Sequence, residues 1–192
     1  MSEALQVVEE TPLLPISEYN KAKMVAERVL LSYSNELLIQ IVRPATVCGY
    51  SPRMRLDVSV NMLTMQALTK GLITVFGGDQ TRPNIHIDDI TDLYLFLLES
   101  NTSGIFNAGF ENISILDIAN RVTEFIPAEI QVTESHDPRS YRLNSDKLLR
   151  IGFKPQKTVN DAVQELIFKF QSNELKEDDR SYNIRTMKAL AV

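Results

Sequence analysis

A tyrosine and a lysine stand four residues apart in the first part of the sequence, at Tyr19 and Lys23. Residues at this spacing lie on one face of an α-helix, so the phenol and the ammonium can meet over a single site. An ammonium beside a phenol stabilises the phenolate and makes proton transfer easier. The pair can therefore act as a general acid and base. The spacing also occurs by chance in many helices, and a surface lysine beside a half-buried tyrosine is the alternative interpretation.

Three arginines are candidates for binding an anionic group. Arg43 follows an apolar run, Arg82 follows a Gly-Gly-Asp turn, and Arg139 lies in the polar stretch Asp-Pro-Arg at 137–139. A planar guanidinium suits a diphosphate because it can donate two parallel hydrogen bonds, although most loop arginines are simply solvated.

Other chemistries have little support in the sequence. We expect no metal site, because His86 and His136 are the two histidines and neither belongs to a cluster with ligand spacing. Cys48 has no base close in sequence, and no Gly-x-Ser-x-Gly elbow is present. Neither the Rossmann nor the Walker pattern of phosphate-binding glycines occurs in the 192 residues.

Length and composition are those of an ordinary globular protein. The chain has 192 residues, of which 44% are apolar and 23% charged, and its net charge is −5. With no basic block, we expect neither nucleic acid nor a membrane as a partner. No run of 18 apolar residues and no signal pattern is visible, and the single cysteine fits a reducing compartment. We therefore expect a cytoplasmic protein.

The elements that must position the tyrosine and lysine follow from the apolar spacing. A helix is predicted from residue 18 or 19 to about 34–35, with Ser17 as its N-cap. The apolar run 37–42 predicts a strand covered on both faces, as in parallel sheets. The loop 44–52 then lies at the carboxyl end of that strand, where open α/β sheets bind their ligands. The fold class is therefore α/β.

The remaining pattern continues this alternation of helices and strands. Residues 1–17 read as an extended loop, and residues 173–192 as a charged, loosely held tail. Helices are predicted at 58–70, 88–98, 114–125, 145–151 and 159–170, and strands at 72–76, 85–87, 104–108 and 129–134.

Four segments in register resemble the extended short-chain dehydrogenase/reductases, the NAD-dependent sugar epimerase/dehydratase family. They are Pro-Leu-Leu-Pro-Ile-Ser-Glu-Tyr-Asn-Lys-Ala-Lys at 12–23, Ile-Val-Arg-Pro-Ala-Thr-Val-Cys-Gly at 41–49, Ile-Thr-Val-Phe-Gly-Gly at 73–78, and Arg-Pro-Asn-Ile-His-Ile-Asp-Asp at 82–89. The resemblance runs from about residue 10 to about residue 166.

The resemblance implies the remainder of a Rossmann-type parallel sheet plus a smaller α/β substrate-binding domain. Residues 1–56 would form the C-terminal part of the NAD-binding domain, 57–172 mainly the substrate-binding domain, and 173–192 the tail. Residues 85–110 either belong to the second domain or return to the sheet. The family begins with a Gly-rich strand–turn–helix, so the resemblance also implies a C-terminal part that lacks this half.

Site residues are likewise implied by position in the family. Tyr19 matches the catalytic tyrosine, and Lys23 the lysine that supports it and holds the nicotinamide ribose of NAD or NADP. The family residues that lie against the nicotinamide correspond to Pro44, Ala45 and Val47. Those that contact a nucleotide-diphosphate sugar correspond to Thr46, Asn61, Arg82 and Arg139. The sequence departs from the family at 46–50, where Thr-Val-Cys-Gly-Tyr replaces the usual Asn-Val-Tyr-Gly-Pro.

Three hypotheses remain open at this point. The chain is a truncated or split nucleotide-sugar epimerase/dehydratase that needs a missing N-terminal segment, a non-catalytic module that binds nucleotide sugars, or a structural unit. In this family the tyrosine helix packs in a dimer interface, so a homodimer through that helix is expected. The sequence leaves open the sugar, the nucleotide, and epimerisation versus dehydration.

Overall fold

The structure is a computed structural model that describes residues 5–135 and 140–190. His136 and Arg139 lie outside the described residues. The first part of the chain forms β1 (Leu5–Val7), α1 (Glu18–Leu31), β2 (Gln40–Pro44), β3 (Thr46–Cys48), α2 (Ser59–Lys70), β4 (Leu72–Phe76), β5 (Thr81–His86) and α3 (Ile87–Glu99). The second part forms β6 (Gly104–Ala108), β7 (Glu111–Ser114), α4 (Ile115–Phe125), β8 (Glu129–Thr133), β9 (Tyr141–Leu143), α5 (Asp146–Arg150), α6 (Val159–Gln171), a short 3-10 turn (Asp179–Ser181) and α7 (Asn183–Leu190).

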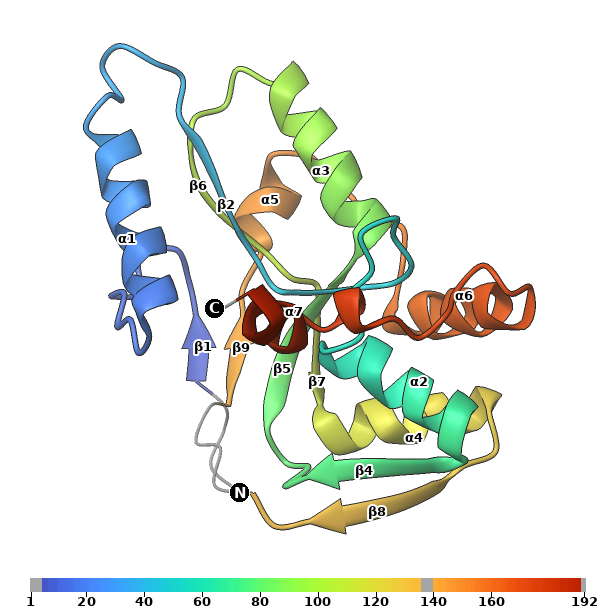
Figure 1. Cartoon of the computed structure of the whole chain (residues 1–192). Coiled ribbons are helices and arrows are strands. Elements are labelled where there is room, and N and C mark those ends of the chain that lie inside the picture. The colour runs from blue at the N-terminus through green and yellow to red at the C-terminus, as the bar shows by residue number, and fades with distance from the viewer. Residues whose placement is uncertain (1–4, 136–139, 191–192) are drawn as a thin grey trace.

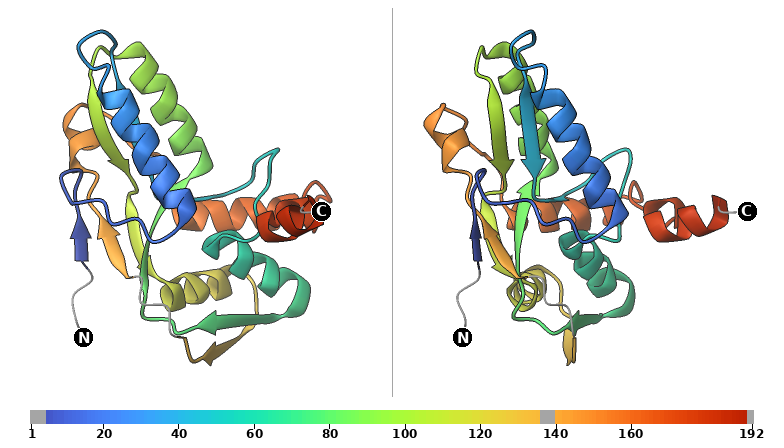
Figure 2. Two further views of the ribbon diagram at one scale, coloured as in Figure 1. Left: turned by 60° about the vertical axis from the view of Figure 1, so that its left-hand side comes forward. Right: turned by 90° about the vertical axis from the view of Figure 1, so that its left-hand side faces the viewer.

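Parallel strand pairs dominate the described part of the chain. β2 pairs with β6, β4 with β8, β1 with β9 and β3 with β5, all in parallel. The antiparallel pair β5–β7 completes a three-stranded sheet in the order β3–β5–β7. α1 and α3 lie on opposite sides of the β2–β6 pair, whereas α2 and α4 lie beside β4 and α6 packs against these two helices (Figures 1 and 2). The predicted α/β class is confirmed.

Apolar side chains pack in three clusters. The largest joins α2, α4 and α6 to β4, and includes the fully buried Leu63, Val75 and Ile118. A second lies between α3 and β6, around Phe106 and Leu93. The third joins the loop before α2 to the C-terminal segment, through residues such as Leu56 and Leu175. α2 thus has apolar neighbours on two sides.

The helices that border the later site begin and end at recognisable caps. The Asn20 amide donates to the Ser17 Oγ at 3.2 Å, which caps α1. Gly71 ends α2 in a left-handed conformation at φ 62°, as glycine commonly does. No helix among the described residues is long and apolar enough to cross a membrane.

Several sequence-based boundaries are corrected by the structure. α1 ends at Leu31 rather than near residue 34, and the predicted strand 37–42 begins at Gln40. Leu37 and Leu38 are exposed, so the apolar run extends beyond the strand that it predicted. The loop 44–52 contains the short strand β3, and β1, β7 and β9 were not predicted.

The C-terminal segment is more ordered than the sequence suggested. Leu175 and Ser181 are buried, and the Leu56 amide donates to the Ser181 carbonyl at 2.9 Å. The Asn183 amide donates to Asp57 at 3.0 Å, and the Arg53 guanidinium to the Asn183 side chain at 3.1 Å. The prediction of a loosely held tail is therefore wrong for this stretch, because its polar backbone pairs with the loop before α2.

Candidate functional site

A cleft of about 520 Å³ is lined by residues of α1, the β2–β3 junction and the start of α2. Its lining includes six residues singled out from the sequence, which are Tyr19, Pro44, Ala45, Thr46, Val47 and Asn61. These residues come from α1, β2, β3, the junction between the two strands, and α2, so the cleft is formed by the tertiary structure. Gly49, Ser51, Arg53, Arg55, Val58, Ile87 and Tyr141 complete the lining.

Tyr19 and Lys23 lie one helical turn apart on α1, as their spacing predicts. The Lys23 Nζ is 5.5 Å from the centroid of the Tyr19 ring. Tyr19 is 70% exposed, so its phenol is accessible from the cleft. Lys23 faces a neighbouring hollow of about 250 Å³ that it shares with Glu27 and Arg43. The Arg43 Nε donates to Glu27 at 3.0 Å, which ties α1 to β2.

Residues 44–47 form one wall of the cleft, and backbone hydrogen bonds to neighbouring segments hold this wall in place. The Ala45 amide donates to the Ala108 carbonyl at 2.7 Å, and Thr46 and Val47 pair with β5. A Cβ added to Gly109 would lie 2.6 Å from the Ala45 Cβ, so the backbone of residue 109 approaches this wall closely. Only glycine leaves room for that approach. The wall is consequently a rigid, largely apolar surface.

Arg82 does not line the main cleft but an adjacent hollow of about 350 Å³. Thr46 and Val58 line both spaces, so the two lie next to each other. Arg82 is half-buried on β5, and its Nη1 donates to the Thr81 carbonyl at 3.3 Å. Arg43, the third arginine considered from the sequence, is engaged with Glu27 and with the Glu9 carbonyl.

Asn61 lies in the first turn of α2 and is buried. Its Oδ1 accepts from the Gly49 amide at 3.0 Å, and its Nδ2 donates to the carbonyls of Gly49 at 3.3 Å and Arg55 at 2.9 Å. The side-chain amide therefore bridges both ends of the loop that borders the cleft.

Arg53, Arg55 and Tyr141 also line the cleft, and none of them was expected there from the sequence. Only Met54 separates the two arginines, and both lie in the loop that precedes α2, so this close pair of cations was the signal in the sequence. Arg55 pairs with Asp57 at 2.9 Å, and the backbone of the C-terminal segment accepts from Arg53. Tyr141 gave no signal, because β9 is three residues long.

The Cys48 thiol is not placed for nucleophilic chemistry. It is 1% exposed, and its Sγ donates to the Ile85 carbonyl at 3.4 Å. Burial, followed by the nearby negative charge of Glu111, raises the pKa of Cys48 to about 12. Within residues 5–135 and 140–190, no group of three histidine, cysteine or acidic side chains is arranged to hold a metal ion.

Sequence comparison places the chain among known enzymes. Residues 3–109 match the model of the NAD dependent epimerase/dehydratase family. The chain is 26% identical to a UDP-glucose 4-epimerase of Lactobacillus helveticus over 189 residues, covering 83% of this chain and 57% of that protein. It is 29% identical to UDP-glucuronic acid decarboxylase 3 of Arabidopsis thaliana, covering 76% and 45%. The chain thus spans about half the length of the curated relatives that it matches.

Solved structures share the fold. A dTDP-glucose 4,6-dehydratase from Bacillus anthracis in complex with NAD superimposes with a TM-score of 0.77 at 20% identity, covering 96% of this chain and 60% of that one. A UDP-glucuronic acid 4-epimerase from Bacillus cereus, in complex with UDP-glucuronic acid and NAD, gives a TM-score of 0.72 at 28% identity, covering 90% and 58%. The resemblance drawn from the four sequence segments is therefore confirmed, and this chain belongs to the NAD dependent epimerase/dehydratase family.

Proposed function

We propose that this chain carries the proton-transfer group and the substrate-binding side of an NAD-dependent epimerase or dehydratase of nucleotide-diphosphate sugars. The cleft supports this most, because it brings a phenol, an apolar wall and the start of α2 around one space. A phenol that exchanges protons and a surface that orients a sugar are the parts that the protein contributes in such reactions. The relatives named above include a UDP-glucose 4-epimerase and a UDP-glucuronic acid 4-epimerase, and this supports UDP-linked sugars as the proposed substrate class.

In this proposal Tyr19 exchanges a proton with a hydroxyl group of the sugar. Its exposure leaves the phenol free to reach a bound ligand. The ammonium of Lys23, one turn along α1, stabilises the negative charge that the phenol oxygen acquires. Bound NAD supplies the hydride acceptor and donor of the reaction. Arg82, in the hollow next to the cleft, binds the diphosphate by paired hydrogen bonds, and Arg139 is assigned the same role by resemblance alone.

The residues present fit one end of the cofactor. Pro44, Ala45 and Val47 offer an apolar wall for a nicotinamide ring, and Lys23, which lines the neighbouring hollow, would hold its ribose. The 192 residues contain no Gly-rich turn before a helix, the element that commonly binds the pyrophosphate of NAD. We therefore expect the 192-residue chain to bind NAD weakly on its own. Calorimetry with NAD tests this, and micromolar affinity would contradict it.

Substrate binding can be tested by thermal unfolding with UDP-glucose, UDP and glucose. UDP-glucose and UDP should raise the melting temperature, because a ligand at about 100 times its Kd stabilises by about 2.7 kcal/mol, and glucose should not. Arg82→Ala should reduce the shift, whereas Tyr19→Phe should leave it unchanged. If UDP-glucose and dTDP-glucose both leave the melting temperature unchanged, the assigned substrate class is wrong.

A second candidate function is a non-catalytic module that binds the same ligands. The observation in its favour is α1, which contains no buried residue and so holds Tyr19 loosely. Incubation with UDP-glucose and NAD, followed by NMR of the sugar, separates the two. A changed sugar that is lost in Tyr19→Phe supports the enzyme, and binding without any change supports the module.

We also propose that two copies pair through α1. The side chains of Val25 and Val29 lie one turn apart on this helix, and both are exposed, as is Leu30. Burying such a stripe against a second copy would remove apolar surface from water. Light scattering should find a dimer that Val29→Glu dissociates, and a monomeric wild-type chain would contradict this assembly.

A further inference from the structure

The loop from Gly49 to Asp57 forms one side of the cleft and presents Ser51, Arg53 and Arg55 to it. The loop leaves β3 through Gly49, whose φ of +102° favours glycine. A Cβ at this position would lie 3.0 Å from the His86 Nε2 and 3.2 Å from the Glu165 Oε2. The loop therefore begins in direct contact with two side chains from β5 and α6.

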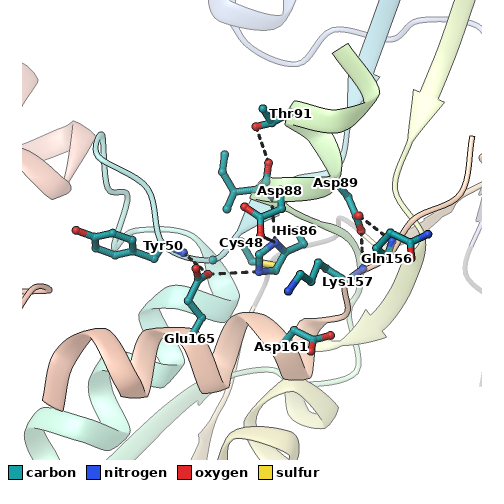
Figure 3. A network of polar contacts seen from close by, with 12 residues as sticks. Cys48, Tyr50, His86, Asp88, Asp89, Thr91, Gln156, Lys157, Asp161 and Glu165 are labelled. Carbon is teal, nitrogen blue, oxygen red and sulfur yellow. Dashed lines mark hydrogen bonds and ion pairs between the residues drawn. The ribbon is translucent and has the colours of Figure 1, made fainter. Parts of the chain in front are cut away.

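Glu165 reaches the loop from α6, an element far from it in sequence. Its Oε2 accepts from the Tyr50 amide at 3.0 Å (Figure 3). One turn further along α6, the Lys169 Nζ lies 5.2 Å from the centroid of the Tyr50 ring. Residues four apart share a helix face, so α6 holds both the backbone and the ring of Tyr50.

His86 holds the other side of Glu165. Its Nδ1 accepts from the Asp88 amide at 3.1 Å, which leaves the Nε2 of a neutral ring to carry the proton. The Nε2 lies 3.4 Å from the Glu165 Oε2 but is not aligned for a hydrogen bond, so this contact is electrostatic. His86 is almost fully buried, whereas the Glu165 side chain is 30% exposed. The carboxylate is thus placed between a fixed imidazole and the loop backbone.

We propose that Glu165 is a positioning residue of the cleft. By accepting from the Tyr50 amide, it fixes the first turn of the loop, and Asn61 fixes Gly49 and the carbonyl of Arg55. Arg53 and Arg55 reach the cleft from the stretch between these two anchors. Loss of the Glu165 anchor frees that stretch and weakens binding of an anionic sugar nucleotide. The ligand in this inference rests on the proposed function, but the anchoring of the loop does not.

The test combines amide hydrogen exchange with calorimetry of UDP-glucose binding. In Glu165→Ala, the amides of residues 50–54 should exchange at least tenfold faster, while those of Gly49, Leu56 and β4, whose acceptors do not change, keep their wild-type rates. The affinity for UDP-glucose should fall about tenfold. Glu165→Gln retains an acceptor for the Tyr50 amide, so it should keep most of the protection and of the affinity. Gln164→Ala, at the exposed neighbouring position of α6, is the matched control and should change neither quantity.

The outcomes separate the two proposals. If Glu165→Ala leaves the exchange of residues 50–54 unchanged, or if Glu165→Gln loosens the loop as much as alanine does, the positioning role is overturned. If wild-type chain binds no nucleotide sugar but Glu165→Ala still loosens the loop, the proposed function fails and the positioning role holds. Glu165→Leu fills a similar volume without an acceptor, so it provides the same test should the alanine variant unfold.

Discussion

α1 and α2 border the same cleft but are packed in different ways. α2 has six buried residues among its 12, and apolar clusters surround it. α1 has none among its 14 and is tied to β2 by the Glu27–Arg43 ion pair. The helix that carries the proposed proton-transfer group therefore depends little on the core, whereas the helix on the substrate side is part of it. Local stability should follow this division.

The largest difference should come from removing apolar side chains on the two helices. Leu63 of α2 is fully buried, so Leu63→Ala should lower the free energy of unfolding by about 2–5 kcal/mol. Val29 of α1 is 54% exposed within one chain, so Val29→Ala should change the free energy of unfolding by less than about 0.5 kcal/mol at a concentration too low for two copies to pair. Urea unfolding of both variants measures the contrast. A cost above about 2 kcal/mol for Val29→Ala would mean that α1 is packed against something in solution.

Alkaline pH should destabilise the packed side of the molecule. The thiol of Cys48 ionises near pH 9.0 when unfolded but has a pKa of about 12 in the fold, so between these values the unfolded chain releases a proton that the folded chain keeps. Stability therefore falls as pH rises from about 9 to about 12, with a slope of about 1.4 kcal/mol per pH unit for one group. Burial and the hydrogen bond to Glu177 also raise the pKa of Tyr182 to about 12, from 10.0.

Urea unfolding at several alkaline pH values measures this slope. Cys48→Ala should reduce the slope above pH 9, and Tyr182→Phe should reduce it only above pH 10, because tyrosine ionises later in the unfolded chain. The same slope in the wild-type chain and in both variants would show that other groups govern the alkaline transition.

The smallest effects should come from the N-caps of the two regions. Thr158 caps α6 in a capping box with Asp161, and Thr158→Ala should cost about 1 kcal/mol of global stability. Ser17→Ala removes the equivalent bond at α1, but it should mainly speed amide exchange within that helix. Equal losses of global stability in the two variants would show that α1 unfolds together with the core.

Long, regular patterns predicted the fold best. The strands at Leu72–Phe76 and Gly104–Ala108 were predicted to the residue, since each is an apolar run bounded by turn residues. The helix from Ile115 was equally clear, because Ser114 caps it and Pro127 follows it. β7 and β9 were missed because they are short and polar, and the side chain of Asn112 bridges them to each other.

Residues of the cleft were found by resemblance more than by pattern. The spacing of Tyr19 and Lys23 also occurs by chance in many helices. The order and spacing of the four family-like segments made a catalytic role for the pair the better interpretation. The contact of Glu165 with Tyr50 and His86 could not be predicted, because it joins α6 to two distant segments through one side chain. Such contacts depend on tertiary packing, which the period of a single helix does not encode.

Because Cys48 is buried, the rate at which its thiol is labelled measures how often the fold opens around it. Cys48 is the single sulfhydryl among the 192 residues, and its thiolate, the form that attacks thiol reagents, is disfavoured in the fold. Labelling should proceed only when β3 separates from β5 and admits the reagent. The labelling rate therefore reports how often the wall of the cleft opens, and its slowing by a ligand would show that the ligand keeps that wall closed, with no cysteine added to the sequence.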